Sequence, residues 1–248
     1  MSAAHLGIEV KGEDGQVRTP SDISENIGRV RREIAAHAAL VGRNPNDVTV
    51  VAVTKTYEPR LINEVIQSGI TDIGENRVQE ILEKYDDVLP VNWHMIGHLQ
   101  RNKVKSIINK VKMIHSVDSF RLAEEINLRA GEVGTVMDIL IQVNTAEEES
   151  KFGINSDALR DLFLDVLEKC EYIRIRGLMC MAPFAEDPED VRLYFRETKT
   201  QFDSLRAIVH ERLELQFLSM GMSGDFGVAI EEGSNIVRIG TAIFGGKR

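Results

Sequence analysis

The chain has 248 residues, of which 43% are hydrophobic and 28% charged, and its formal net charge is -9 at pH 7. This composition is that of an ordinary globular protein, and no apolar run is long enough to cross a bilayer, so we expect no membrane partner. The negative charge opposes general attraction to nucleic acid, whose binding depends on neutralising phosphates with Lys and Arg, and therefore favours a small-molecule ligand.

The first twenty residues show neither helical nor strand periodicity. We expect residues 1–20 to form a flexible N-terminal extension and residues 21–248 to form a single domain. The start also lacks the pattern of a secretory signal, which favours the cytoplasm. We expect Cys170 and Cys180 to be reduced thiols, because a chain of this size needs no disulfide.

After residue 20, helix-like and strand-like patterns alternate. Apolar residues recur at helical spacing over 23–41 and predict an amphipathic helix, with Asp22 as its N-cap and Glu25 as the partner of that cap. The β-like runs that follow number eight, at 48–54, 71–75, 92–97, 113–118, 138–144, 173–181, 217–221 and 236–240. Further helix-like stretches lie between these runs, for example at 60–67, 120–130, 157–169 and 191–213.

Eight β/α alternations favour a closed parallel α/β barrel of the TIM type, (β/α)8, because closure removes both exposed edge strands. An open doubly wound sheet is the alternative fold. No internal repeat and no linker rich in Pro, Gly and Ser marks a second domain. We therefore predict a single (β/α)8 barrel and expect it to be a monomer.

Lys55 stands at the end of the first predicted strand, where α/β barrels place reactive groups. Alternation puts Val51, Val53 and Lys55 on one face, so the lysine points into the barrel mouth if the valines fill the interior. Burial there would free its amine as a nucleophile toward an aldehyde. The alternative is a solvated lysine at a strand end.

Two glycine-containing turns near the C-terminus predict an anion site. The first contains Ser223 and leads into a helix expected at 226–232, whose N-terminus offers unpaired backbone N–H groups. The second is Gly240-Thr241, which adds backbone donors and a hydroxyl. Because the turns after strands seven and eight are the usual phosphate site of this fold, we expect a phosphate here. The alternatives are Ser223 as a helix cap and Gly240 as a turn residue.

Arg238 shares a face of the last strand with Ile236 and Gly240. Closure of the barrel makes this strand the neighbour of the first, so Lys55 and Arg238 should flank one pocket. Since a buried arginine is costly without a partner, we expect an acceptor on the ligand or a nearby carboxylate. A structural salt bridge is the alternative.

His94 and His98 are four residues apart, but they lie around a strand end and no third ligand is apparent. We therefore expect no metal, and a packing and hydrogen-bonding role for both at the mouth of the barrel.

Several separate stretches together resemble the pyridoxal 5′-phosphate (PLP) homeostasis protein family, single-domain relatives of the alanine racemase barrel. They are VAVTK at 51–55, GENRVQE at 74–80, HMIGHLQRNK at 94–103, GLM at 177–179, MGMS at 220–223 with Asp225, and VRIGTAIFG at 237–245. The resemblance covers essentially the whole chain after residue 20. It implies a barrel of PLP fold type III without the C-terminal β domain.

The resemblance also implies that PLP is the cofactor and that Lys55 binds it covalently as a Schiff base. By the same likeness, Ser223, Gly240 and Thr241 hold the phosphate, and Arg238 faces the pyridine nitrogen. The implied role is intracellular PLP (vitamin B6) homeostasis with little or no turnover, in which apo-PLP enzymes are potential recipients.

Two further residues, Asn76 and Met222, are expected beside the cofactor because they lie in the matching stretches. No catalytic residue is assigned. The alternative function is a PLP-dependent amino-acid racemase or decarboxylase with Lys55 as its base, and a third is an aldolase that forms a Schiff base with a phosphosugar. Racemases of this barrel type use a tyrosine base opposite the lysine, and Tyr57 follows Lys55 closely enough to remain a candidate.

Overall fold

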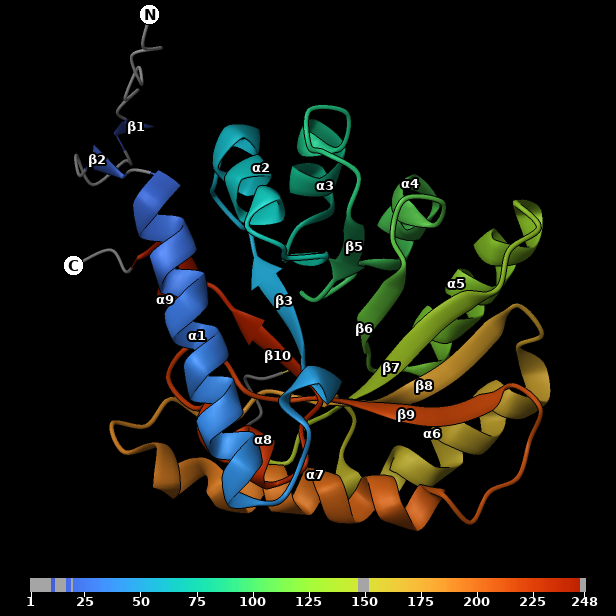
Figure 1. The fold of residues 1–248 in the computed structure, drawn as a ribbon. Coiled ribbons are helices and arrows are strands. Elements are labelled where there is room, and N and C mark those ends of the chain that lie inside the picture. The colour runs from blue at the N-terminus through green and yellow to red at the C-terminus, as the bar shows by residue number, and fades with distance from the viewer. Residues whose placement is uncertain (1–9, 12–16, 19, 147–151, 246–248) are drawn as a thin grey trace, which may run out of the picture.

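The computed structural model describes residues 10–11, 17–18, 20–146 and 152–245. Eight parallel strands close into a barrel in the order β10-β3-β4-β5-β6-β7-β8-β9 (Figure 1). They are β3 (Thr49–Val53), β4 (Asp72–Glu75), β5 (Asn92–Met95), β6 (Met113–Val117), β7 (Met137–Val143), β8 (Ile173–Cys180), β9 (Leu213–Ser219) and β10 (Ile236–Ile239). The predicted closed barrel is confirmed, and the open sheet is excluded because β10 pairs with β3.

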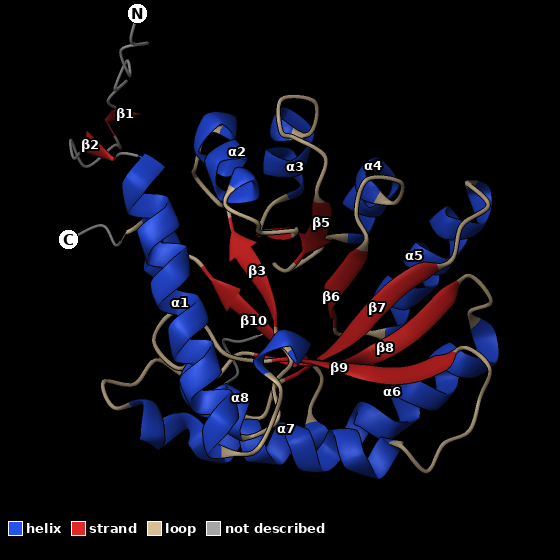
Figure 2. Ribbon diagram, viewed as in Figure 1, coloured by secondary structure: helices blue, strands red, loops and turns tan. Residues whose placement is uncertain are grey.

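The helices lie outside the strands, as Figure 2 shows. They are α1 (Pro20–Leu40), α2 (Pro59–Gln67), α3 (Val78–Lys84), α4 (Val104–Ile107), α5 (Phe120–Glu132), α6 (Ser156–Lys169), α7 (Arg192–Leu205), α8 (Phe226–Glu231) and α9 (Thr241–Phe244). Single turns of 3-10 helix occur at η1 (Pro45–Asp47), η2 (Arg101–Lys103) and η3 (Pro188–Val191). None of the helices in the described ranges is both long and apolar enough to cross a membrane.

The predicted ends of three elements were wrong. Asp22 lies inside the first turn of α1 and does not cap it, because the helix already begins at Pro20, whose missing N–H costs nothing at that position. The helix expected over 191–213 ends at Leu205, and β9 begins at Leu213 instead of 217. Residues of β9 up to Phe217 alternate between half-buried and exposed, which is the pattern of a strand with one covered face.

At the N-terminus, β1 (Val10–Lys11) and β2 (Val17–Arg18) form a short antiparallel pair. Most of the extension predicted for residues 1–20 falls on 1–9, 12–16 and 19, which lie outside the described residues, so its flexibility and the domain division at residue 20 stay predictions. The apolar stripe of α1 is buried from Ile23 to Ile34, and the helix packs against α8 and α9.

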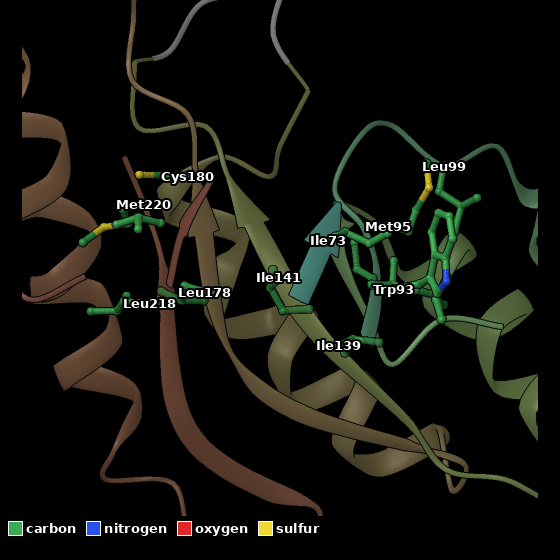
Figure 3. Packing of buried hydrophobic residues seen from close by; sticks show 14 of the residues in the cluster. Ile73, Trp93, Met95, Leu99, Ile139, Ile141, Leu178, Cys180, Leu218 and Met220 are labelled. Atoms are coloured by element: carbon green, nitrogen blue, oxygen red, sulfur yellow. The ribbon is translucent and has the colours of Figure 1, made fainter. Parts of the chain in front are cut away.

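Hydrophobic side chains form two separate layers. The larger fills the space between the strands and the helices, and Figure 3 shows a part of it that includes Ile139, Leu178 and Leu218. The smaller cluster contains Met113, Leu140 and Met179. Both cysteines are buried and unpaired, as predicted, and burial raises the pKa of each thiol to about 11. Neither is therefore a reactive thiolate at neutral pH.

Candidate functional site

A pocket of about 260 Å³ lies at the carboxyl ends of the barrel strands. Four residues predicted for the site line it together, namely Lys55, Asn76, Met222 and Arg238. They come from distant parts of the sequence, and closure of β10 onto β3 brings the first and last of them to one side of the barrel. The rest of the lining consists of Val53, Ile96, Gly97, His98, Gln142, Phe152 and Met181.

Lys55 comes two residues after the end of β3. Val51 and Val53 are buried without joining the outer core, whereas Ala52 between them belongs to it, so the alternation that turns Lys55 toward the barrel mouth is as predicted. The predicted burial of Lys55 is wrong, because the residue is exposed. The strand has ended at this point, so the side chain is no longer enclosed by neighbouring strands.

Arg238 is 3% exposed and reaches the pocket from inside the barrel. Its guanidinium donates to the carbonyl of Ser219 at 2.7 Å, to the hydroxyl of Ser219 at 2.6 Å and to the carbonyl of Cys180 at 2.8 Å. No carboxylate of the described chain forms an ion pair with Arg238, although the negative charge of Asp225 is close enough to act on its pKa. The expected acceptor on the ligand stays a prediction. Burial lowers its pKa from the ordinary value, but a guanidinium remains charged at neutral pH.

The two glycine turns meet at Ser223. Its hydroxyl accepts from the backbone N–H groups of Gly240 and Ala242, both at 3.2 Å. Ser223 is therefore not the cap of α8, a position that Asp225 occupies. The pocket lining does not include Ser223, Gly240 or Thr241, but it includes their near neighbours in sequence, Met222 and Arg238. A Cβ on Gly240 would lie 3.5 Å from the Cβ of Val53, another lining residue.

Gly221 sets the shape of the first turn. Its φ is +88°, and an added Cβ would lie 2.7 Å from the Cβ of Ala229 and 2.8 Å from the Cα of Phe226. We expect Gly221→Ala to lower the free energy of unfolding by about 2 kcal/mol, through backbone strain and overlap with α8. Urea denaturation measures this loss. Gly224→Ala is the matched control, because nothing lies within 4 Å of its Cβ, and equal losses in both variants would contradict the prediction.

A chain of buried polar side chains extends from Arg238 into the barrel. The Ser219 hydroxyl is 3.0 Å from Nδ1 of His115, whose Nε2 is 2.9 Å from Nδ1 of His94. Nε2 of His94 is in turn 2.9 Å from Oδ1 of Asp72. With both imidazoles neutral and protonated on Nε2, every link has one donor and one acceptor, so the chain runs from a fixed cation to a carboxylate.

This arrangement corrects one expectation and adds a residue that sequence reasoning missed. His94 lies inside the barrel on β5 and not at its mouth, because β5 begins at Asn92 and turns this residue inward. His115 was overlooked, although its place two residues after Met113 on β6 puts it on the inner face. Only His98 lies at the mouth, where its ring stacks on Phe152 at 3.9 Å.

His115 should make the barrel sensitive to acid. Burial lowers its pKa well below the ordinary value, and repulsion by His94, whenever that ring is protonated, and by Arg238 acts in the same direction. Below about pH 6.5 the unfolded chain binds a proton here that the folded chain does not, so stability falls by about 1.4 kcal/mol per pH unit. Denaturation with urea between pH 7 and 5.5 measures this slope.

His115→Gln keeps an acceptor and a donor at this position without a titrating group, and we expect it to flatten the dependence on pH. His98→Gln is the control, since His98 is exposed in the fold. An unchanged slope in the His115 variant would exclude this residue as the cause.

Two other expectations concern residues near the pocket. The ring of Tyr57 stacks on that of Phe244 in α9, with 4.0 Å between the ring centroids, and Tyr57 is not among the residues that line the pocket.

No group of three or more His, Cys, Asp or Glu within the described ranges is placed to hold a metal ion. The absence of a bound metal stays a prediction.

Comparison with known proteins gives consistent matches. Residues 26–248 match the family model "Alanine racemase, N-terminal domain". The pyridoxal phosphate homeostasis protein of Aquifex aeolicus is 44% identical over 226 residues, which cover 90% of this chain and 98% of that protein. The crystal structure of an unknown protein from Bifidobacterium adolescentis superposes with a TM-score of 0.85 at 32% identity, over 97% of this chain and 100% of that one.

A second solved structure shows a ligand. PipY of Synechococcus elongatus, solved with PLP bound, superposes with a TM-score of 0.76 at 32% identity. The match covers 90% of this chain and 100% of PipY.

Proposed function

This chain belongs to the pyridoxal phosphate homeostasis protein family, and on that premise we propose that it binds PLP through Lys55 as a Schiff base and serves PLP homeostasis in the cytoplasm. The observation that carries the proposal is that Lys55, Asn76, Met222 and Arg238 line one and the same pocket. The binding of PLP by PipY, a protein of the same fold at 32% identity, supports it.

The residues of the site suit the chemical groups of PLP. Lys55 is an exposed primary amine on the pocket wall, which is the group that condenses with an aldehyde. The N–H groups of Gly240 and Ala242 converge on the Ser223 hydroxyl beside the pocket, so donors for an anionic group are already gathered there. We propose that Ser223, Gly240 and Thr241 hold the phosphate.

Arg238 bears on how reactive a bound cofactor would be. PLP supplies an electron sink when bound, and it is a stronger one when its pyridine nitrogen is protonated. We propose that Arg238 faces this nitrogen, where its fixed positive charge disfavours protonation by like-charge repulsion. Its three hydrogen bonds to Ser219 and Cys180 keep that charge in place. This favours a carrier with little turnover.

The alternative function is a PLP-dependent racemase or decarboxylase. Such an enzyme needs an acid or base opposite the lysine, and no tyrosine is among the described residues that line the pocket. Tyr57, the nearest candidate in sequence, stacks on Phe244 instead. Transfer of PLP to apo-enzymes and a monomeric state are further parts of the proposal.

The proposed function is tested by reduction with borohydride in the presence of PLP, followed by peptide mapping. We expect the pyridoxyl mass on the peptide that contains Lys55. A panel of L- and D-amino acids then distinguishes carrier from enzyme, because rapid isomerisation or loss of carbon dioxide would refute the carrier. Trapping of a sugar phosphate on Lys55, with no uptake of PLP, would support an aldolase.

A further inference from the structure

The residue that follows Lys55 has an unusual backbone. Thr56 has a φ of +66°, and it is the one non-glycine residue with positive φ in the described part of the chain. The left-handed region is unfavourable for L-residues and most of all for β-branched ones such as threonine. A conformation of this kind persists only where surrounding contacts impose it.

Glu80 on α3 makes the contact that holds this turn. Its Oε2 accepts the backbone N–H of Thr56 at 2.7 Å and also the Nζ of Lys84 at 2.8 Å. Since Glu80 lies on a helix that packs outside the barrel, the hydrogen bond fixes the loop after β3 to a rigid element.

Lys84 extends the same arrangement to the other neighbour of Lys55. Its ammonium donates to the carbonyl of Thr54 at 3.0 Å and to Oε1 of Glu75 at 2.8 Å, in addition to Glu80. The hydroxyl of Thr54 donates to the same oxygen of Glu75 at 2.7 Å. Thr54 therefore contacts Lys84 and Glu75, and Thr56 contacts Glu80. The ammonium of Lys84 links the two sides, because it donates to both carboxylates.

Burial makes this cluster sensitive to the loss of any member. Glu75 is fully buried and Lys84 is 8% exposed. Burial raises the pKa of Glu75, and the hydrogen bond and charge of Lys84 offset this only in part. For Glu80 burial acts to raise the pKa, but the hydrogen bonds from Lys84 and Thr56 together with the charges of Lys84 and Arg77 outweigh it, so the pKa is lowered and the carboxylate stays ionised.

From these contacts we infer that Glu80 is a positioning residue for Lys55: with Lys84 it holds Thr56 in the left-handed conformation, and the held turn directs the Lys55 amine into the pocket. The inference rests on the proposed function, because it concerns how Lys55 meets PLP. Glu80 is not among the pocket-lining residues and acts only through the backbone.

The test compares the rate at which PLP forms the borohydride-trappable adduct on Lys55. In Glu80→Ala, Thr56 loses its acceptor and relaxes to negative φ, and we expect the rate to fall about tenfold. Adding Thr56→Gly to Glu80→Ala should restore the rate to within about threefold of the wild type, because glycine adopts positive φ without a steric cost. Thr56→Gly alone should resemble the wild type.

Glu83→Ala is the matched control, since Glu83 is an exposed glutamate on the same helix. Thermal unfolding of each variant without PLP identifies any variant that has lost its fold. A Glu80→Ala variant with the wild-type rate would overturn the inference, and so would a double variant as slow as Glu80→Ala. In both cases the wild type still forms its adduct, whereas a wild type without any adduct overturns the proposed function itself.

Discussion

Lys55→Ala is expected to abolish the covalent attachment of PLP and the visible absorption that comes with it. No other lysine is among the described residues that line the pocket, so no second amine there can replace it. Because Lys55 is exposed, the substitution should change the free energy of unfolding by only about 0.5 kcal/mol. Absorption spectra with added PLP and the mass of the borohydride-reduced protein measure the loss.

Lys105→Ala serves as the control for this experiment, because Lys105 is an exposed lysine on α4, and it should take up PLP as the wild type does. A Lys55 variant that keeps both the spectrum and the added mass would place the attachment elsewhere and end the assignment of Lys55.

Arg238→Ala is expected to have the largest effect on stability. The substitution leaves the carbonyls of Ser219 and Cys180 without their buried donor and opens a cavity inside the barrel. Each unpaired buried acceptor costs about 1–3 kcal/mol, so we expect the free energy of unfolding to fall by about 3 kcal/mol or more. Urea denaturation without PLP measures this. Affinity for PLP should fall as well, since Arg238 lines the pocket.

Two variants make the Arg238 result specific. Arg206→Ala removes an arginine from an exposed position just after α7 and should cost less than about 1 kcal/mol. Arg238→Lys keeps the charge, but a single ammonium lacks the planar fork that reaches Ser219 and Cys180 together, so it should recover only part of the loss. A loss below about 1 kcal/mol in Arg238→Ala would mean that the network inside the barrel contributes little to stability.

The effects expected for Lys55 and Arg238 differ because Lys55 is exposed to solvent whereas Arg238 is buried, although both line the pocket. Lys55 lies beyond the end of its strand and is exposed, so it has little packing to lose. Arg238 lies within β10 and contributes packing, hydrogen bonds and charge at once. Substitution of the first should therefore separate binding from stability, whereas substitution of the second changes both.

Much of the barrel was predictable because most of its strands are short apolar runs separated by helix-like stretches. The eight strands and their parallel order follow from runs such as 48–54, where near-continuous β-branched residues indicate burial on both faces. β9 was predicted with a late start, because its first half is covered on one face only and carries alternating polar residues. A search for continuous apolar runs does not detect the first half of such a strand.

Within the site, local pattern was enough for some residues and not for others. Alternation along β3 correctly turned Lys55 toward the mouth, and the order of the strands placed Arg238 beside it. The exposure of Lys55 was not predictable, because it depends on how far loops from other strands cover the pocket. Nor were the partners of Arg238, since Ser219 and Cys180 reach it from two other strands.

Sequence by itself determined the alternation of strands and helices, the face on which Lys55 and Arg238 lie, and the positions of the two glycine turns, because these depend on periodicity and on neighbours along the chain. Only the tertiary structure decided which polar groups meet inside the barrel, as with His115 and Asp72, and which contacts hold Thr56. Those contacts join residues that are far apart in sequence, and their geometry exists only once the strands have closed into a ring.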